Sequence, residues 1–248
     1  AEELDGGKIL KALNSSDFAI HSFLSYIITL QYLNIPSCDD EYVVRILLNL
    51  DSHMHWFEEL VINENDEDKI RPDLLLLEIK KDDFCDEYGN LKINATVIEC
   101  KMGNEDNVKK NKAITQVKKG ILSLSKIWDK SIETSKRYWS NQLYRALIFS
   151  KINIDEDDEK YERVINKIEG VLNGRYKINW SGKVFAYWIN SKEITCIDNC
   201  VYDIDDVEHI TSDIRIIECG QLYIKKMLLP EEKREENQVF EEEIIEDL

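Results

Sequence analysis

Two short apolar runs, each with charged residues at one end, constrain the fold of this chain more than any other feature. The first is RPDLLLLEI (71–79), and the second is LKINATVIECK (91–101), which is rich in β-branched residues. Runs of this length, bounded by turn-forming residues, are typical of buried β-strands. The charged segment between them, KKDDFCDEYGN (80–90), ends in Gly-Asn, so we expect it to close a β-hairpin. The sequence therefore predicts an antiparallel pair of buried strands.

Three charged residues gather at one end of this predicted hairpin. Asp73 opens the first strand, and Glu99, which follows it by 26 residues, closes the second together with Lys101. Side chains in a strand alternate between faces with a period of two, so Glu99 and Lys101 share a face. If the strands pair antiparallel, Asp73 lies across from Glu99 at about 5 Å, the usual cross-strand spacing.

Two carboxylates and one ammonium group at a sheet end suit the hydrolysis of phosphodiesters. Hard carboxylate oxygens bind Mg²⁺, which keeps several water ligands and accepts phosphate oxygens of the substrate. The metal lowers the pKa of a bound water and neutralises the charge that develops on the phosphate. We expect Lys101 to hold the attacking water and to stabilise that charge, because a lysine near a metal stays protonated unless it is strongly desolvated.

The patterns outside the hairpin predict an α/β fold. Apolar residues at spacings of three and four indicate one face of a helix over 105–128, and we expect further helices at 18–34, 39–50 and 155–172. Strands are expected at 55–62, 142–154 and 183–190, with shorter candidates in ITCI, DIRIIEC and LYIKKMLL. A meander of three strands, a crossover helix and a fourth strand build a mixed sheet with helices on both faces.

The motifs RPD (71–73) and ECK (99–101), joined by a hairpin and followed by a long helix, resemble those of the PD-(D/E)xK nuclease superfamily. This group includes restriction endonucleases, Holliday-junction resolvases and RecB-type nucleases, and the resemblance covers roughly residues 39–152. It implies a restriction-endonuclease-like mixed β-sheet flanked by helices on both faces. By the family pattern, the metal ligands are Asp73, Glu99 and the backbone carbonyl of Cys100, and the catalytic lysine is Lys101. Gln116 stands where RecB-like members often place a functional glutamine. The implied cofactor is Mg²⁺, for which we expect Mn²⁺ to substitute.

Two features depart from the family pattern. Members usually carry a further acidic residue on the first core helix, and here Glu41, Glu58 and Glu59 remain alternatives. The long helix also has a second stripe about 140° away from its apolar face, taking 100° per residue. That stripe comprises Lys109, Lys112, Gln116, Lys119, Ser123 and Lys126. Gln116 is therefore expected either in the site or in solvent.

The charge distribution bears on the substrate. The chain has a net charge of −17, but residues 101–151 hold twelve Lys or Arg against four Asp or Glu. The local field, rather than the net charge, decides where a polyanion docks. We expect this basic segment to line the cleft and to supply most phosphate contacts, with a solvated helix face as the alternative. Tyr138, Trp139 and Tyr144 are expected in the core rather than stacked on bases.

Other potential metal ligands are explained more simply. Cys196 and Cys200 lack a second pair of ligands at zinc spacing, and six cysteines are too sparse for a disulfide scaffold in a chain of 248 residues. A turn between two elements explains the presence of His53 and His55 without a metal.

There is no apolar run long enough to cross a membrane and no secretion signal, so we expect a cytoplasmic protein.

We divide the chain into an N-terminal helical extension (1–38), a nuclease core (39–192), a strand-rich extension (193–230) and an acidic tail (231–248). The predicted function is a metal-dependent DNA endonuclease domain. The resemblance extends to nuclease modules of bacterial phage-defence and phosphorothioate-dependent restriction proteins, which implies a larger defence or repair protein as the parent. The alternative is a nuclease-fold module that binds nucleic acid or assembles a complex without cutting. The expected partners are DNA and other subunits of such a complex. The sequence leaves open whether the chain also cleaves RNA and whether it forms homo-oligomers.

Overall fold

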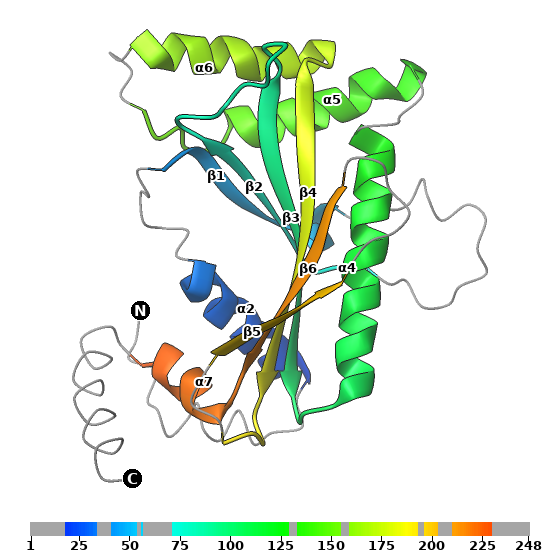
Figure 1. Ribbon diagram of the computed structural model, residues 1–248, viewed down its shortest axis with the longest axis vertical. Helices are drawn as coiled ribbons and strands as arrows, with labels where there is room; N and C mark the ends of the chain where they lie inside the picture. The colour runs from blue at the N-terminus through cyan, green and yellow to red at the C-terminus, as the bar shows by residue number, and fades with distance from the viewer. Residues whose placement is uncertain are drawn as a thin grey trace.

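The described residues form one six-stranded mixed β-sheet with helices on both faces, as the computed structural model shows (Figure 1). The structure describes residues 18–33, 41–53, 56, 71–128, 133–154, 159–192, 196–202 and 210–229. The strands are β1 (Tyr42–Asn49), β2 (Leu74–Lys80), β3 (Leu91–Gly103), β4 (Tyr176–Trp188), β5 (Cys196–Tyr202) and β6 (Ile210–Cys219). The helices are α2 (Phe18–Leu33), α4 (Asn107–Trp128), α5 (Glu133–Ile148), α6 (Glu159–Gly170) and α7 (Gln221–Met227), with 3₁₀ turns η1 (Leu50–His53) and η2 (Val171–Asn173).

The strand order is β1-β2-β3-β4-β6-β5. Strands β1, β2 and β3 are an antiparallel meander, which confirms the predicted hairpin between 71 and 101. Strand β4 then lies parallel to β3, and the chain reaches it through α4, α5 and α6, because parallel neighbours need a long crossover. Beyond β4, β6 runs parallel to it and β5 closes the sheet as an antiparallel edge. The 193–230 segment thus contributes two strands to the same sheet as the predicted core.

The hairpin strands are apolar throughout because both faces of the sheet are covered. Leu75 and Leu77 of β2 pack with the β3 residues Ile93 and Val97 in a cluster that includes buried residues of α4, α5 and α6. Alternate residues such as Leu76 belong to a second cluster together with residues of α2 and α7. In a strand that is buried on both faces, every side chain contacts the core, so apolar residues do not alternate with polar ones and the sequence is a continuous apolar run. The predicted mixed α/β sheet with helices on both faces is therefore present.

The predicted helix at 39–50 is wrong, because this segment is the edge strand β1. It pairs antiparallel with β2, from Tyr42 opposite Lys80 to Asn49 opposite Leu74. The segment YVVRILLN contains β-branched residues and is short, and a short apolar run has no clear helical or extended period. The strand predicted at 55–62 falls outside the described residues, apart from Trp56.

Two predicted strands are helices in the structure. The segment 142–154 was expected to be a strand, but residues 142–148 are the end of α5, which buries Trp139, Leu143 and Leu147 at helical spacings of four. Trp139 is thus in the core, as expected, and Tyr144 packs partly against it. The same prediction is wrong for Tyr138, which is 46 % exposed. The LYIKKMLL segment forms α7 instead of a strand and buries Ile224. The fourth strand of the predicted order, at 142–154, is therefore wrong. The strand that pairs with β3 is β4, which overlaps the predicted 183–190 segment and begins earlier, at Tyr176.

The long helices that the sequence predicts are confirmed. The segment 18–34 is α2, the segment 105–128 is α4, and the segment 155–172 contains α6 and η2. The last of these ends as expected at Gly174, whose φ of 69° is in the left-handed region that favours glycine at a helix terminus. Among the described helices, none combines the length and the apolarity needed to cross a membrane.

Candidate active site

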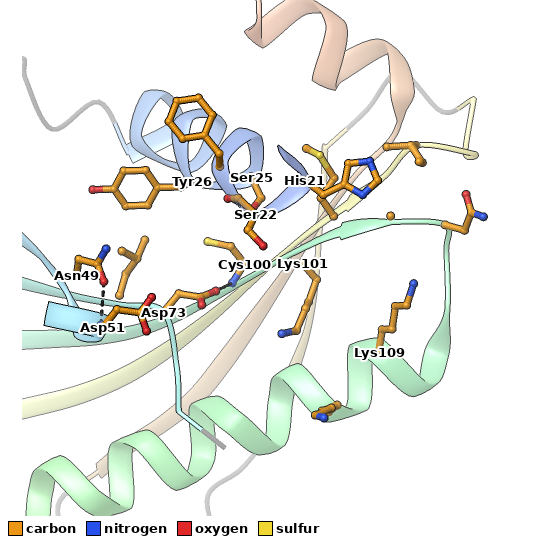
Figure 2. Close-up of a pocket in the computed structure, with 17 residues that line it drawn as sticks. His21, Ser22, Ser25, Tyr26, Asn49, Asp51, Asp73, Cys100, Lys101 and Lys109 are labelled. Carbon is orange, nitrogen blue, oxygen red and sulfur yellow. Dashed lines mark hydrogen bonds between the residues drawn. The ribbon is translucent and has the colours of Figure 1, made fainter. Parts of the chain in front are cut away.

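The candidate site lies where β3 extends beyond its neighbour β2. The pairing of these strands stops at Leu74 opposite Ile98, whereas β3 continues along β4 to Gly103. Strand β1 also stops here, since Asn49 is opposite Leu74. The early end of two strands leaves a cleft of about 1010 Å³, with α2 on one side and α4 on the other (Figure 2).

Asp73 is fixed on the floor of this cleft by the strand that extends past it. Its backbone N–H donates to the Ile98 carbonyl at 3.1 Å, and its Oδ2 accepts from the Cys100 N–H at 2.8 Å (Figure 2). The carboxylate thus takes the place of the missing strand neighbour at Cys100. The N–H and C=O of one residue in a strand point to the same side, so the Cys100 carbonyl also points to this open edge.

Glu99 and Lys101 form an ion pair next to Asp73. The Glu99 side chain is fully buried, and its Oε1 accepts from the Lys101 ammonium. Its Oε2 is buried without a hydrogen-bond partner among the described residues. Burial raises the pKa of Glu99 to about 8, and repulsion from Asp73 adds to the shift while Lys101 opposes it. Burial also raises the pKa of Asp73, and the Cys100 N–H opposes that shift.

The structure therefore brings together Asp73, Glu99 and Lys101, which the sequence placed at one end of the hairpin. The β2–β3 register, extended by one residue beyond Leu74 and Ile98, sets Asp73 directly opposite Glu99. Repulsion from Asp73 makes Glu99 harder to ionise, whereas the raised pKa of Asp73 is caused by its burial. That these residues catalyse a reaction stays a prediction.

Gln116 is buried rather than in solvent, although its stripe on α4 is polar. Only 8 % of its surface is exposed, and its Nε2 donates to the Arg71 carbonyl at 2.9 Å. Its Oε1 is buried without a hydrogen-bond partner among the described residues. Gln116 contacts the backbone of the RPD motif and is not among the residues that line the cleft. This contact gives it a part in positioning Asp73, which follows Arg71 by two residues.

Gly120, one turn further along α4, supports the same motif by its lack of a side chain. A Cβ at this position would be 2.5 Å from Cγ of Pro72 and 3.1 Å from Cγ1 of Val97. Pro72 is tethered to the backbone through its ring, so it cannot move aside like a long flexible side chain. The RPD segment can therefore lie against α4 only where the helix has a glycine.

We expect Gly120→Ala to displace Pro72 and, with it, Asp73. The added methyl should cost about 1–3 kcal/mol of the free energy of unfolding, as overpacking of a core does, and should weaken Mg²⁺ binding. Gly182→Ala is the matched control, because its Cβ would meet Val117 at 2.4 Å and Ile214 at 2.9 Å, away from the motif. Urea unfolding and Mg²⁺ titration of both variants test this, and equal loss of Mg²⁺ affinity in the two would contradict it.

The oxygen atoms at this end of the sheet suit a hard divalent cation. Asp73 and Glu99 supply two carboxylates, and the partnerless Glu99 Oε2 is a buried acceptor that a cation would satisfy. Among the described residues there is no cluster of three or more His, Cys, Asp or Glu side chains that could hold a metal. Mg²⁺ does not require such a cluster, because it binds through one or two carboxylates and keeps several water ligands. The residues present therefore fit Mg²⁺.

The first helix that the structure describes, α2, contains no Asp or Glu, so it does not supply the expected further acidic residue. Glu41 cannot replace it, because it forms an ion pair with Lys80 at the far end of β2, about 20 Å from Asp73 along a seven-residue strand. Glu58 and Glu59 fall outside the described residues. His53 bonds through Nδ1 to the Asn49 carbonyl and does not line the cleft.

Sequence reasoning missed Asp51, which lines the cleft (Figure 2). Asp51 forms an ion pair with Arg71. It follows β1 by two residues, and the end of β1 adjoins the start of β2. The signal was available in the sequence as a charged residue just after an apolar run. It was hidden because the run was interpreted as a helix, which would have pointed Asp51 elsewhere.

The raised pKa of Glu99 predicts how the metal-free protein responds to pH. In the unfolded chain this carboxyl releases its proton near pH 4.5, whereas in the folded protein it keeps the proton up to about pH 8. Between these values the folded state binds more protons, so the free energy of unfolding falls as pH rises. We expect Glu99 to contribute a loss of roughly 3–5 kcal/mol across this range.

Glu99→Gln tests this expectation, because it removes the titrating group and keeps an oxygen that Lys101 can contact. Urea unfolding without divalent metals should show a flatter pH dependence for the variant than for the wild type. The same pH dependence in both proteins would show that the Glu99 carboxyl does not carry the effect.

The basic segment reaches the cleft through its first residues. Lys101 lies on the floor, and Lys109 and Lys112 of α4 line the cleft. Lys110 instead binds Glu218 on β6 at 3.2 Å. The cleft is thus lined by the carboxylates of Asp73 and Asp51 and by three lysines, with the buried Glu99 carboxyl paired to Lys101. Together these groups can bind a divalent cation and a phosphate. Comparisons with protein-family models, with curated proteins and with solved structures found no match to this chain.

Proposed function

We propose that this chain is a metal-dependent nuclease domain that hydrolyses phosphodiester bonds in DNA. The observation that supports this most is the meeting of Asp73, Glu99 and Lys101 at an open strand end, where the buried Glu99 Oε2 has no hydrogen-bond partner among the described residues. Two acidic groups that both resist ionisation are costly to bury together, so a fold that retains them points to a bound cation.

Each residue has a task in this proposal. Asp73, Glu99 and the Cys100 carbonyl would hold Mg²⁺ or Mn²⁺. When bound, the cation lowers the pKa of a water ligand and neutralises charge on the phosphate. Lys101 has three N–H donors, of which one is directed to Glu99. The other two can hold a water molecule and a phosphate oxygen, and the ion pair with Glu99 orients the ammonium for both.

A second candidate function has one observation in its favour. Helix α2 has no acidic residue, and the exposed Asp51 carboxylate is held by Arg71 instead. A site with two carboxylates in place of three fits a module that binds nucleic acid or assembles a complex without cutting it. The buried, partnerless Glu99 oxygen argues for the nuclease, because a binding module has no use for it.

Cleavage of supercoiled plasmid DNA distinguishes the two functions. We expect nicked and linear products with Mg²⁺ or Mn²⁺, and none with a chelator. Asp73→Asn is the matched control for a contaminating nuclease, since it keeps an acceptor for the Cys100 N–H and removes one metal-binding charge. Plasmid and single-stranded DNA that are both bound but left intact in both metals would replace the nuclease with the binding module.

A further inference from the structure

The two walls of the cleft differ in chemistry. On α2, Phe23 and Tyr26 both line the cleft, and their spacing of three residues makes them neighbours on the helix surface. On α4, Lys109 and Lys112 line it at the same spacing. Figure 2 shows Tyr26 on α2, Lys109 on α4, and Asp73 and Lys101 between the two helices. One wall is thus aromatic and the other cationic.

The aromatic wall includes a ring that lies outside both apolar clusters of the described residues. Phe23 is 60 % exposed and belongs to neither apolar cluster, whereas Tyr26 packs partly against the α2-side cluster. Covering an exposed phenyl ring is favourable because it removes apolar surface from water, so a ligand that stacks on Phe23 would gain free energy. Between these rings and the strand ends, α2 presents the small side chains of Ser22 and Ser25, which leave the space above Cys100 open (Figure 2).

The cationic wall has ammonium groups available for a ligand. Neither Lys109 nor Lys112 has an ion-pair partner among the described residues, in contrast to Lys110 and Lys101. The Lys109 ammonium lies close to Gly103, at the end of β3, with 3.4 Å between its Nζ and the position of a Cβ on that glycine. Two free charges on one helix face suit consecutive phosphates of a polyanion.

We propose that the cleft binds an unpaired strand of DNA, with its phosphates toward α4 and its bases stacked on Phe23 and Tyr26. This inference rests on the proposed nuclease function and specifies its substrate. Aromatic rings and a basic groove are the two elements of single-strand recognition, because every base has a stacking face that needs no particular sequence. In a duplex those faces are covered by neighbouring base pairs, so a strand could not address both walls at once.

Binding of a fluorescent oligothymidylate, measured by anisotropy with a chelator present, tests this inference. We expect the single strand to bind at least about tenfold more tightly than a duplex of equal length. Phe23→Ala and Tyr26→Ala should each weaken binding of the single strand by about tenfold, the effect of losing one base stack. Phe23→Trp should retain binding. Phe149, which is 84 % exposed on a different helix end, provides the matched control Phe149→Ala, with unchanged affinity.

The lysine wall is tested by salt dependence in the same assay. Lys109→Ala with Lys112→Ala should flatten the slope of log affinity against log salt by roughly 0.7 for each lost phosphate contact on a single strand. Equal affinity for duplex and single strand, or full affinity after both aromatic truncations, would overturn the inference.

The binding assay contains a chelator, so its result does not depend on metal-dependent cleavage. Single-strand binding that depends on both rings, without cleavage in any metal, keeps the inference and rejects the nuclease. Metal-dependent plasmid cleavage, together with single-strand affinity that is unchanged by Phe23→Ala and Tyr26→Ala, keeps the nuclease and rejects the inference.

Discussion

Lys101→Ala is expected to abolish cleavage while DNA binding stays nearly intact. Loss of one preorganised donor at a phosphoryl-transfer site costs about 10²–10³-fold in rate, and Lys101 would hold both the water and the developing charge. Its contribution to affinity should be less than about fivefold, because one partly exposed ion pair contributes about 0.2–1 kcal/mol. Single-turnover cleavage in Mg²⁺ and anisotropy in Ca²⁺ measure the two effects separately.

The ion pair of Lys101 with Glu99 requires a control for indirect loss of the metal. Lys101 lowers the pKa of Glu99, so its removal favours the protonated carboxyl and weakens the site for cations. Lys101→Met keeps the aliphatic chain, and a Mg²⁺ titration by thermal shift shows whether metal still binds. Lys177, exposed at the start of β4, provides the control Lys177→Ala with wild-type cleavage. Wild-type cleavage by Lys101→Ala would refute the assigned site.

Mg²⁺ is expected to stabilise the wild type, and Asp73→Asn should lose both this effect and cleavage. A ligand at 100 times its Kd adds about 2.7 kcal/mol to the free energy of unfolding. In a chain of this size that amounts to a rise in Tm of roughly 5–10 °C. Asn keeps an oxygen for the Cys100 N–H but removes one of the two charges that bind the cation. Differential scanning fluorimetry against Mg²⁺ concentration measures both proteins.

Without metal, the order of stability should reverse. Asp73 and Glu99 repel each other, and this repulsion contributes to the raised pKa of Glu99. Asp73→Asn removes it, so the variant should melt higher than the wild type above about pH 8 in a chelator. A wild-type Tm that does not respond to millimolar Mg²⁺ would contradict the proposed Mg²⁺ site and, with it, the metal-dependent nuclease.

The hairpin and its three charged residues were predictable because they depend on local regularities. A period of two fixes which side chains share a face, and the antiparallel pairing of two strands joined by residues 81–90 sets Asp73 opposite Glu99. Both strands are buried on two faces, so their sequences admit few other structures. The same holds for α4, whose apolar stripe is long enough to define a helical period.

Other parts of the site depend on contacts that are distant in sequence. Gln116 is on a polar stripe, and it is buried only because the Arg71 backbone passes over α4 at that point. Segment 42–49 was misread because its partner, β2, determines that it is extended. The aromatic wall was missed for a similar reason: α2 was correctly predicted, but its position beside Asp73 depends on how it packs on the sheet.

The bond from Asp73 to the Cys100 N–H has a consequence for self-association. Beyond Ile98, the edge of β3 would otherwise present unpaired backbone groups to any extended chain, and such edges promote aggregation. The carboxylate occupies that edge with a negative charge, so a residue proposed to act in cleavage also keeps foreign strands away. Asp73→Ala therefore differs from Asp73→Asn, since alanine leaves the Cys100 N–H without its acceptor and exposes a short strand edge that can pair with another chain.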